Sequence, residues 1–493
     1  MLRIFSPLIL INKIPLVHLQ YFIGRWGANA VKGEVSLLFP CLRFCKEPII
    51  ATIIVYFFTF FKGVFEKSYK ILQIFLSKRG KTADFSFFRR RKPLRALTKR
   101  KKSFIMYGKE TTMKRIYLDH AATTPLDKEI LEKMTPYFLA DFGNADSPHA
   151  QGRAAMNAVD NARDLLAEKI NAKPSEVYFT SGGTEADNWA MYCGAYAAKE
   201  KGRNQILVSA IEHHAVLASA ERLKNEGFEI VYIPAAKNGK IEVKTLQSLL
   251  CERTGLVAVM SANNETGVLQ PIEELCAAAK AAGSLFFTDG VQLAPYLPVD
   301  VKKSGVDMLS LSAHKFYGPK GCGALYIKGG VKMRGLIVGG EQERGLRGGT
   351  SNVPAIVGMA AAYAKNLQEQ ADAAEKLRGL RALFLQELAG EDGVEINGEE
   401  GLPALLNLRL KGIRNTDFVY SMDLKGVSLS AGSACASASI KPSHVLLAMG
   451  LSEEEARESV RFSFGKENTK EEILQAANVA KELISRLRGG NSL

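Results

Sequence analysis

The sequence predicts an α/β protein with a mostly parallel sheet covered by helices, followed by a smaller α+β domain. From Ile116 onward, short apolar runs alternate with helical stretches, an order typical of parallel strands joined by helical crossovers. After about residue 375 the strand-like runs become sparser, which indicates a second domain with a different arrangement. The composition, 47% hydrophobic and 24% charged, is that of a globular protein.

The spacing of apolar residues and the positions of glycine and proline predict the individual helices and strands. Residues 149–171 are expected to form a helix, because Ala158, Ala162 and Leu166 recur at helical spacing and Pro174 follows. In "EVYFTSGGTEADN" (176–188) a short apolar strand is followed by two glycines and a helix start. The other strand-like runs are 205–210, 229–234, 256–264, 285–290 and 307–312 in the larger domain, and 405–410, 427–431 and 460–464 in the smaller one.

We therefore expect three regions in the chain. Residues 1–112 form an N-terminal extension, and residues 113–375 form the large domain, with 113–125 able to pack with the small domain. Residues 376–493 form the small domain, which includes a loop at 430–441.

Charge and cysteine usage exclude several classes of protein. The net charge is +14, but residues 1–112 alone have a net charge of +17 and the rest has −3. No basic patch outside the extension suggests a nucleic-acid footprint. The seven cysteines are an odd number without a CxxC pair, which favours a reducing compartment, here the cytoplasm, over a disulfide framework. Cys41 and Cys45 lack further ligand types nearby, and no metal site is expected.

The N-terminal extension differs in kind from the rest. Residues 48–61 are continuously apolar, and residues 78–102 carry twelve Lys and Arg against one acid. A membrane anchor with a polybasic flank and a targeting presequence are both compatible with this pattern. We instead expect translation to start at Met113, directly before the first well-patterned strand, so that a membrane is a partner only if residues 1–112 are present.

Polar residues gather where the predicted strands end. These are the places where ligands bind in open α/β sheets. "SGGT" (181–184) offers backbone amides at a helix start, which suit a phosphate. Asp289 follows the apolar run "LFF" and is expected to be a buried carboxylate, which needs a cation or good donors facing it. His213 and Lys315 end two further strands.

Together these residues predict a pyridoxal-phosphate site. The cofactor needs a lysine for its Schiff base and an acidic partner for its pyridinium nitrogen. Lys315 suits the first role, and Asp289, 26 residues earlier, suits the second. An imidazole such as that of His213 can lie against the ring and move protons.

The sequence also resembles the cysteine desulfurases of the NifS/IscS type, which have the type I fold of pyridoxal-phosphate enzymes. The resemblance covers essentially all of 113–493 and rests on ten blocks in family order. They are "YLDHAATTP", "FGNADSPHAQGR", "FTSGGTEADN", "EHHAV", "NNETG", "TDGVQ", "SAHKFYGPKG", "ERGLRGGT", "SAGSACASAS" and "RFSFG".

The resemblance implies residue roles. Lys315 links to the cofactor, His213 stacks on the ring, Asp289 pairs with the ring nitrogen, and Arg461 binds the substrate carboxylate with Asn144 nearby. Cys435 is the nucleophile that carries sulfur as a persulfide and can transiently ligate an iron–sulfur cluster in a partner complex. The other cofactor-binding residues implied are Gly183, Thr184, Asn264, Gln292, Ser312, His314 and Thr350.

The family further implies L-cysteine as substrate, L-alanine as product, and an acceptor or scaffold protein for iron–sulfur cluster assembly or tRNA thiolation. Thr350 is expected to reach the phosphate of a neighbouring subunit, which implies a homodimer. The alternatives are another pyridoxal-phosphate enzyme, such as an aminotransferase or selenocysteine lyase, and a non-catalytic scaffold that binds sulfur acceptors. Cys435 argues against transamination, which needs no thiol, and the intact set of Lys315, Asp289, His213 and Cys435 argues against a scaffold.

Overall fold

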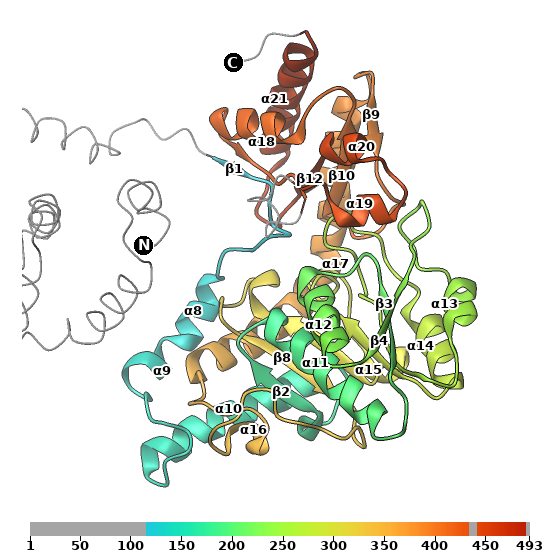
Figure 1. The fold of residues 1–493 in the computed structure, drawn as a ribbon. Helices are drawn as coiled ribbons and strands as arrows, with labels where there is room; N and C mark the ends of the chain where they lie inside the picture. The colour runs from blue at the N-terminus through green and yellow to red at the C-terminus, as the bar shows by residue number, and fades with distance from the viewer. Residues whose placement is uncertain (1–114, 433–440, 490–493) are drawn as a thin grey trace, which may run out of the picture. The chain divides into compact units, whose positions relative to one another are not determined.

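The computed structural model describes residues 115–432 and 441–489, and its central element is a seven-stranded sheet (Figure 1). Across the sheet the strands are β2 (Val177–Thr180), β8 (Gly323–Ile327), β7 (Met308–Ser312), β6 (Leu285–Asp289), β5 (Thr254–Ala258), β3 (Gln205–Ser209) and β4 (Glu229–Ile233).

The direction of the strands determines which edge of the sheet carries their carboxyl ends, where we expect the functional site. β8 is antiparallel to both of its neighbours, β2 and β7, and every other neighbouring pair is parallel. Six strands therefore point the same way, and their carboxyl ends lie at one edge of the sheet. The prediction of a mostly parallel α/β sheet is confirmed.

The strand expected over 256–264 ends earlier, at Ala258. Beyond it, Val259 and Ser261 still donate backbone hydrogen bonds to β6, but the Met260 amide donates to the carboxylate of Glu212 at 2.6 Å. This side-chain acceptor replaces a strand partner, so the chain leaves the ladder there.

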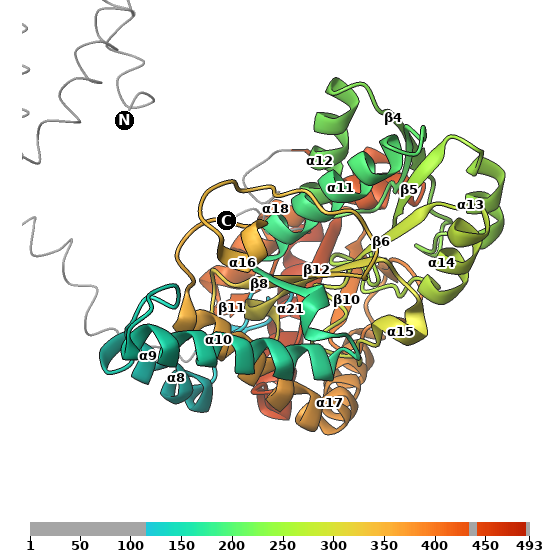
Figure 2. The same cartoon turned by 90° about the horizontal axis from the view of Figure 1, so that it is seen from below.

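Helices cover both faces of the sheet, because successive side chains of each strand point to opposite faces. Leu207 packs in a core with α10 (Ala150–Lys169), α14 (Ile272–Ala281) and α17 (Val353–Leu388). Its neighbours Ile206 and Val208 pack in another core with α11 (Gly183–Lys199) and α12 (His214–Asn225). Figure 2 shows α10 and α17 on one side of the sheet and α11 and α12 on the other.

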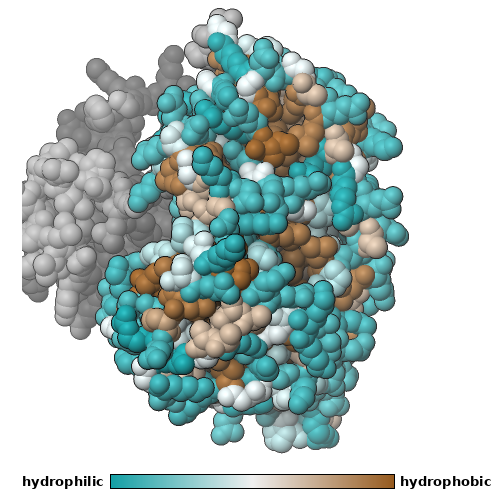
Figure 3. Space-filling view, turned by 90° about the vertical axis from the view of Figure 1, so that its right-hand side faces the viewer, coloured by the Kyte–Doolittle hydropathy of each residue, from teal (hydrophilic) through white to brown (hydrophobic). Residues whose placement is uncertain are grey.

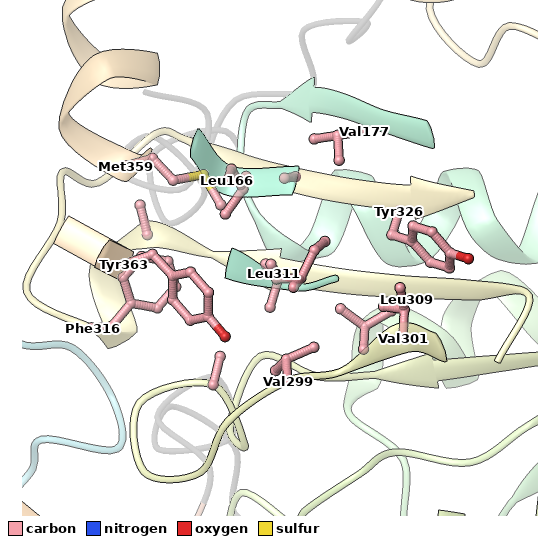
Figure 4. Close-up of a cluster of buried hydrophobic side chains, with 14 of the residues drawn as sticks. Leu166, Val177, Val299, Val301, Leu309, Leu311, Phe316, Tyr326, Met359 and Tyr363 are labelled. Atoms are coloured by element: carbon pink, nitrogen blue, oxygen red, sulfur yellow. The ribbon is translucent and has the colours of Figure 1, made fainter. Parts of the chain in front are cut away.

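The core that the sheet forms with α10, α14 and α17 consists of buried hydrophobic side chains. In Figure 4, Phe316 and Tyr363 lie side by side next to the strand that carries Leu309 and Leu311. The ring centroids of Phe316 and Tyr363 are 5.2 Å apart in an edge-to-face arrangement, which is favourable for aromatic pairs. Phe316 directly follows Lys315, so this packing fixes the backbone that carries the lysine.

A smaller part of the fold is built on two short sheets. In the first, β12 (Ser459–Ser463), β10 (Leu405–Leu410) and β9 (Val394–Ile396) are antiparallel. In the second, β1 (Ile116–Tyr117) is parallel to β11 (Val427–Ser428), so the start of the described chain pairs with its C-terminal part. α18 (Asn415–Leu424) and α21 (Lys470–Arg488) share the core of these sheets.

One long helix joins the two cores. The first half of α17 contributes Ile356, Met359 and Tyr363 to the core of the large sheet, and its second half contributes Phe384 to the other. The domain boundary that we expected after residue 375 lies inside this helix.

The remaining elements are short. They are α8 (Lys128–Met134), α9 (Pro136–Leu139), η3 (Pro174–Glu176), α13 (Val243–Leu249), α15 (Val301–Ser304), η4 (Ala313–Lys315), α16 (Gln342–Gly345), α19 (His444–Ala448) and α20 (Glu453–Arg457).

Hydrophilic residues predominate on the face in Figure 3, and hydrophobic ones form separate patches among them. Over residues 115–432 and 441–489, none of the helices has the length and apolar character needed to cross a membrane.

Candidate active site

Lys315 lies at the carboxyl-end edge of the sheet, in the single turn η4 that follows β7. It is half-buried and does not point freely into solvent. Its Nζ donates to the backbone carbonyls of Ala121 at 2.5 Å and Ala122 at 3.1 Å. The segment that follows β1 therefore forms one wall around the lysine.

Asp289 ends β6, the strand next to β7, and is 4% exposed. Its Oδ1 accepts a hydrogen bond from the Val291 amide at 2.9 Å. Burial raises the pKa of this carboxyl to about 6, against the lowering effects of the Val291 amide, the charge of Lys315 and the Ser310 hydroxyl. At neutral pH the ionised form is therefore the main one, and Lys315 is a cation that favours it.

His213 caps the N-terminus of α12, where its Nδ1 accepts a hydrogen bond from the Ala215 amide at 3.2 Å. Burial, followed by the charge of Lys315, lowers the pKa of His213 to about 4. The ring is therefore neutral at pH 7, and because Nδ1 accepts, its proton is on Nε2. A neutral imidazole close to the lysine can both accept and donate protons.

A cradle for an anion lies at the start of α11. A Cβ on Gly183 would come within 2.8 Å of Val291 Cγ2 and 3.4 Å of Ser312 Cβ, so only glycine fits beside these residues. The helix has no side-chain cap, which leaves its first amides open at the exposed Thr184. A phosphate is suited to such a helix start.

His314 follows Ser312 by two residues and makes hydrogen bonds to the segment after β1. Its Nδ1 is 3.1 Å from Thr123 Oγ1, and its carbonyl accepts from the Thr124 amide at 3.0 Å and the Thr124 hydroxyl at 2.9 Å. Burial, then the charge of Lys315, lowers the pKa of His314 to about 4, which makes it a neutral ligand.

Two amide side chains have a buried oxygen that is unused as an acceptor. Asn264 Oδ1 and Gln292 Oε1 are buried and have no hydrogen-bond partner among the described residues. Gln292 is 3% exposed and follows Asp289 by three residues. An orphaned buried acceptor is costly, so these atoms indicate a polar ligand. The donor set of lysine, buried carboxylate, neutral histidine and glycine cradle fits pyridoxal phosphate.

Arg461 on β12 is 1% exposed and has its charge balanced locally. Its Nη2 donates to Asp119 Oδ1 at 2.7 Å and its Nη1 to the Asn264 carbonyl at 2.8 Å, while its Nε is buried without a partner among the described residues. The guanidinium is therefore held in one orientation with donors to spare. This is the arrangement that a carboxylate can use.

The structure does not bring every predicted site residue into contact. Asn144 is exposed between α9 and α10, and its Oδ1 accepts from the Asp146 amide at 3.1 Å. Within the described residues, Arg461 donates to Asp119 and to the Asn264 carbonyl, and Asn144 is not among these partners. Thr350 is exposed and lines a cavity of about 230 Å³ together with Arg347. Cys435 lies outside the described residues.

Sequence reasoning assigned no role to Asp119, Asp187 or Ser310, which the structure brings into this region. Asp119 pairs with Arg461, and Ser310 Oγ lies at hydrogen-bond distance, 2.5 Å, from Asp187 Oδ1. The sequence positions of Asp187 and Ser310 could have indicated that they lie near the site. Asp187 follows the glycine cradle by four residues, on the α11 face that packs on the sheet, and Ser310 is on the strand that leads to Lys315.

The fold and the site define a pyridoxal-phosphate-dependent enzyme, and comparison with known proteins identifies its family. Residues 116–475 match the aminotransferase class-V model, which spans well over half of the chain. The chain therefore belongs to the aminotransferase class-V family.

Its relatives within this family carry more specific names. The putative cysteine desulfurase IscS 1 of Bacillus subtilis (strain 168) is 45% identical over 380 residues, covering 76% of this chain and all of the relative. The cysteine desulfurase IscS of Escherichia coli O139:H28 is 42% identical over 380 residues, covering 76% and 93%. Among solved structures, a NifS-like protein is 36% identical with a TM-score of 0.71, covering 75% of this chain and 99% of that one. The structure titled "SspA in complex with cysteine" is 33% identical with a TM-score of 0.62, covering 72% and all of that chain.

Proposed function

We propose that the protein is a pyridoxal-phosphate-dependent cysteine desulfurase that converts L-cysteine to L-alanine and transfers the sulfur as a persulfide on Cys435. The observation that carries the proposal is the convergence of Lys315, Asp289 and neutral His213 at one edge of the sheet, with the buried Arg461 lined up by Asp119. The likeness to relatives named cysteine desulfurase supports the choice of substrate.

The cofactor is held by several elements at once. Lys315 would be the residue that links to it, Asp289 would pair with its ring nitrogen, and Asn264 and Gln292 would offer their unused acceptors. The open amides at the start of α11, beside Gly183, would hold its phosphate. Thr184, Ser312 and His314 would be the other phosphate ligands, and Thr350 would reach the site of the second subunit in a homodimer.

When bound, pyridoxal phosphate supplies an electron sink that weakens the bonds around the α-carbon of the substrate. Arg461 binds the carboxylate of L-cysteine through two parallel N–H donors, with Asn144 as a further contact. Asp119 and the Asn264 carbonyl keep the guanidinium from rotating away. The substrate is therefore oriented before any bond changes.

Proton movement falls to Lys315 and His213. Lys315 Nζ lies against the carbonyls of Ala121 and Ala122, which hold the amine at a fixed position. His213 is neutral at pH 7, so its ring can accept a proton from the substrate and then return it. The Cys435 thiolate takes the sulfur as the carbon–sulfur bond breaks, and a proton on carbon completes L-alanine.

The persulfide passes its sulfur to an acceptor protein for iron–sulfur cluster assembly or tRNA thiolation, in the cytoplasm. The function is tested by incubating pure protein with pyridoxal phosphate, L-cysteine and a reductant, and measuring alanine and sulfide. Equal amounts of the two products are expected. A keto acid in place of alanine, or no turnover with any acceptor, contradicts the proposal.

Replacing Asp289 with asparagine is expected to leave the cofactor bound but to lower turnover by roughly 10²–10³-fold, because a neutral amide cannot hold the ring nitrogen protonated. Cofactor content from visible absorbance and kcat for L-cysteine measure the two effects separately. Near-normal turnover in Asp289→Asn would mean that another group pairs with the ring nitrogen.

A further inference from the structure

Three carboxyl groups are buried together at the candidate site, one of which is Asp289. Asp187 on α11 is 1% exposed, Glu212 after β3 is 0% exposed and Asp289 at the end of β6 is 4% exposed. Removing even one carboxylate from water costs several kcal/mol unless a cation or strong donors compensate. Three adjacent charges would repel one another as well, so their protonation states cannot be independent.

Ser310 on β7 connects two of these groups. Its Oγ is 2.5 Å from Asp187 Oδ1 and 3.5 Å from Asp289 Oδ1. A hydroxyl has a single hydrogen, so it cannot donate to both carboxylates at once. If both were ionised, one of them would face the lone pairs of the hydroxyl oxygen.

Glu212 has an incomplete set of partners for a carboxylate. Its Oε1 accepts from the Ser209 hydroxyl and from the Met260 amide, but its Oε2 is buried without a partner in residues 115–432 and 441–489. A charged oxygen left bare is far more costly than a neutral one. The geometry at Glu212 therefore suits a carboxylic acid.

Burial and the neighbouring charge of Asp289 both favour the neutral forms of Asp187 and Glu212. Burial is the main cause that raises the pKa of Asp187 well above its usual range and that of Glu212 to about 8, and the charge of Asp289 raises both further. Lys315 is the cation that acts on Asp289. His213, next to Glu212, is neutral, and His444 contributes its Nε2 at 2.9 Å from the Glu212 carbonyl.

We propose that Asp187 and Glu212 are positioning residues held as neutral carboxylic acids, which leave Asp289 as the single ionised carboxylate of the cluster. This assignment rests on the proposed pairing of Asp289 with the cofactor ring nitrogen. Two neutral neighbours add no repulsion to the charge that this pairing requires.

The same arrangement orders the hydroxyl of Ser310. A neutral Asp187 can donate its own proton to Ser310 Oγ across the 2.5 Å contact. The Ser310 hydrogen is then directed toward Asp289 Oδ1, where it favours the ionised form. Asp187 therefore acts on the cofactor through Ser310 and Asp289 without touching it.

The test uses Asp187→Asn and Glu212→Gln, which are close in shape to the neutral acids. A carboxyl whose folded pKa is raised contributes its stability below the unfolded pKa, and that contribution is lost as pH rises through the folded pKa. For Glu212 the window runs from 4.5 to about 8. In the holoenzyme, the Tm of Glu212→Gln relative to wild type is expected to be ~3 °C higher at about pH 8.5 than at about pH 5.5, and that of Asp187→Asn is expected to change in the same direction.

Asp307→Asn is the matched control. Asp307 is also a buried aspartate, but it pairs with Lys280 at 3.3 Å and accepts from the Phe286 amide at 2.9 Å. Its amide variant is expected to lose Tm at both pH values. A relative Tm for Asp187→Asn or Glu212→Gln that stays constant or falls between about pH 5.5 and pH 8.5 would overturn the proposal, because a carboxyl that is ionised in the folded protein has finished titrating below this range and adds no such rise.

A second measurement needs no variant to fold. Carboxyl carbon NMR of wild-type holoenzyme, with labelled aspartate and glutamate, is expected to show two carboxylic acids that persist at pH 7, assigned through the variants or through neighbouring backbone signals. Titration of every carboxyl below about pH 5 would overturn the assignment. A third measurement follows the visible absorbance band of the bound cofactor as a function of pH. The midpoint of this profile is expected to shift in Asp187→Leu and to stay near the wild-type value in Asp187→Asn. Equal midpoints in the two variants would contradict a role of Asp187 through Ser310. None of these readouts depends on release of sulfur, so failure of the desulfurase proposal is recognised separately.

Discussion

Lys315→Ala is expected to abolish turnover of L-cysteine, by about 10⁴-fold or more, because it removes both the link to the cofactor and a proton-transfer group. The fold should survive, since the side chain is half-buried and its bonds are to the backbone carbonyls of Ala121 and Ala122. The measurements are kcat, visible absorbance and Tm.

Lys320→Ala is the control for this variant, because Lys320 is an exposed lysine in the turn that follows Lys315. It should keep the absorbance and activity of the wild type. Borohydride reduction of the wild-type holoenzyme, followed by peptide mapping, should find the cofactor on the peptide that contains Lys315. An adduct on another lysine would refute the assignment.

Cys435→Ser is expected to bind L-cysteine and change the cofactor spectrum, yet to release no sulfide. Under the proposed mechanism, chemistry at the cofactor requires Lys315 and His213, whereas removal of the sulfur requires the thiol. Single-turnover mass spectrometry of the wild type should locate the added sulfur on Cys435. Full desulfurase activity in Cys435→Ser would leave only the pyridoxal-phosphate assignment standing.

The described cysteines provide the controls for that prediction. Burial raises the pKa of Cys322 to about 12 and those of Cys193 and Cys276 to about 11, so their thiols stay protonated at neutral pH. Cys251 is exposed, but it precedes β5 and therefore lies toward the amino-end edge of the sheet, away from Lys315. Cys251→Ser should keep normal activity.

The sequence was most informative where local pattern and chemistry coincide. Asp289 and Lys315 each follow a short apolar strand, and in a parallel sheet the ends of such strands meet at one edge. The central sheet could therefore be predicted with its polar edge. The antiparallel β8 was not foreseen, because five apolar residues after a turn carry no signal for their direction in a sheet.

Long-range pairs were beyond the reach of sequence patterns. Asp119 and Arg461 are 342 residues apart, and nothing near either residue specifies the other. The same holds for Asp187 and Ser310, where burial of both polar side chains is a product of the packing of α11 on the sheet. Residue 375 lies within α17, a continuous helix whose two halves contribute to different cores, and sequence spacing alone gives no sign of this division of the helix.

The pairing of β1 with β11, and of Asp119 with Arg461, has a consequence for synthesis on the ribosome. The chain emerges from its N-terminal end, so the segment after β1 leaves the ribosome long before its partners on β11 and β12. The large sheet, β2 to β8, can form earlier because its strands lie within residues 177–327. Arg461 can join the carbonyls that hold Lys315 only after β12 has been added, so a nascent chain released before Arg461 can form the sheet but lacks the arginine that we propose as the substrate-binding residue.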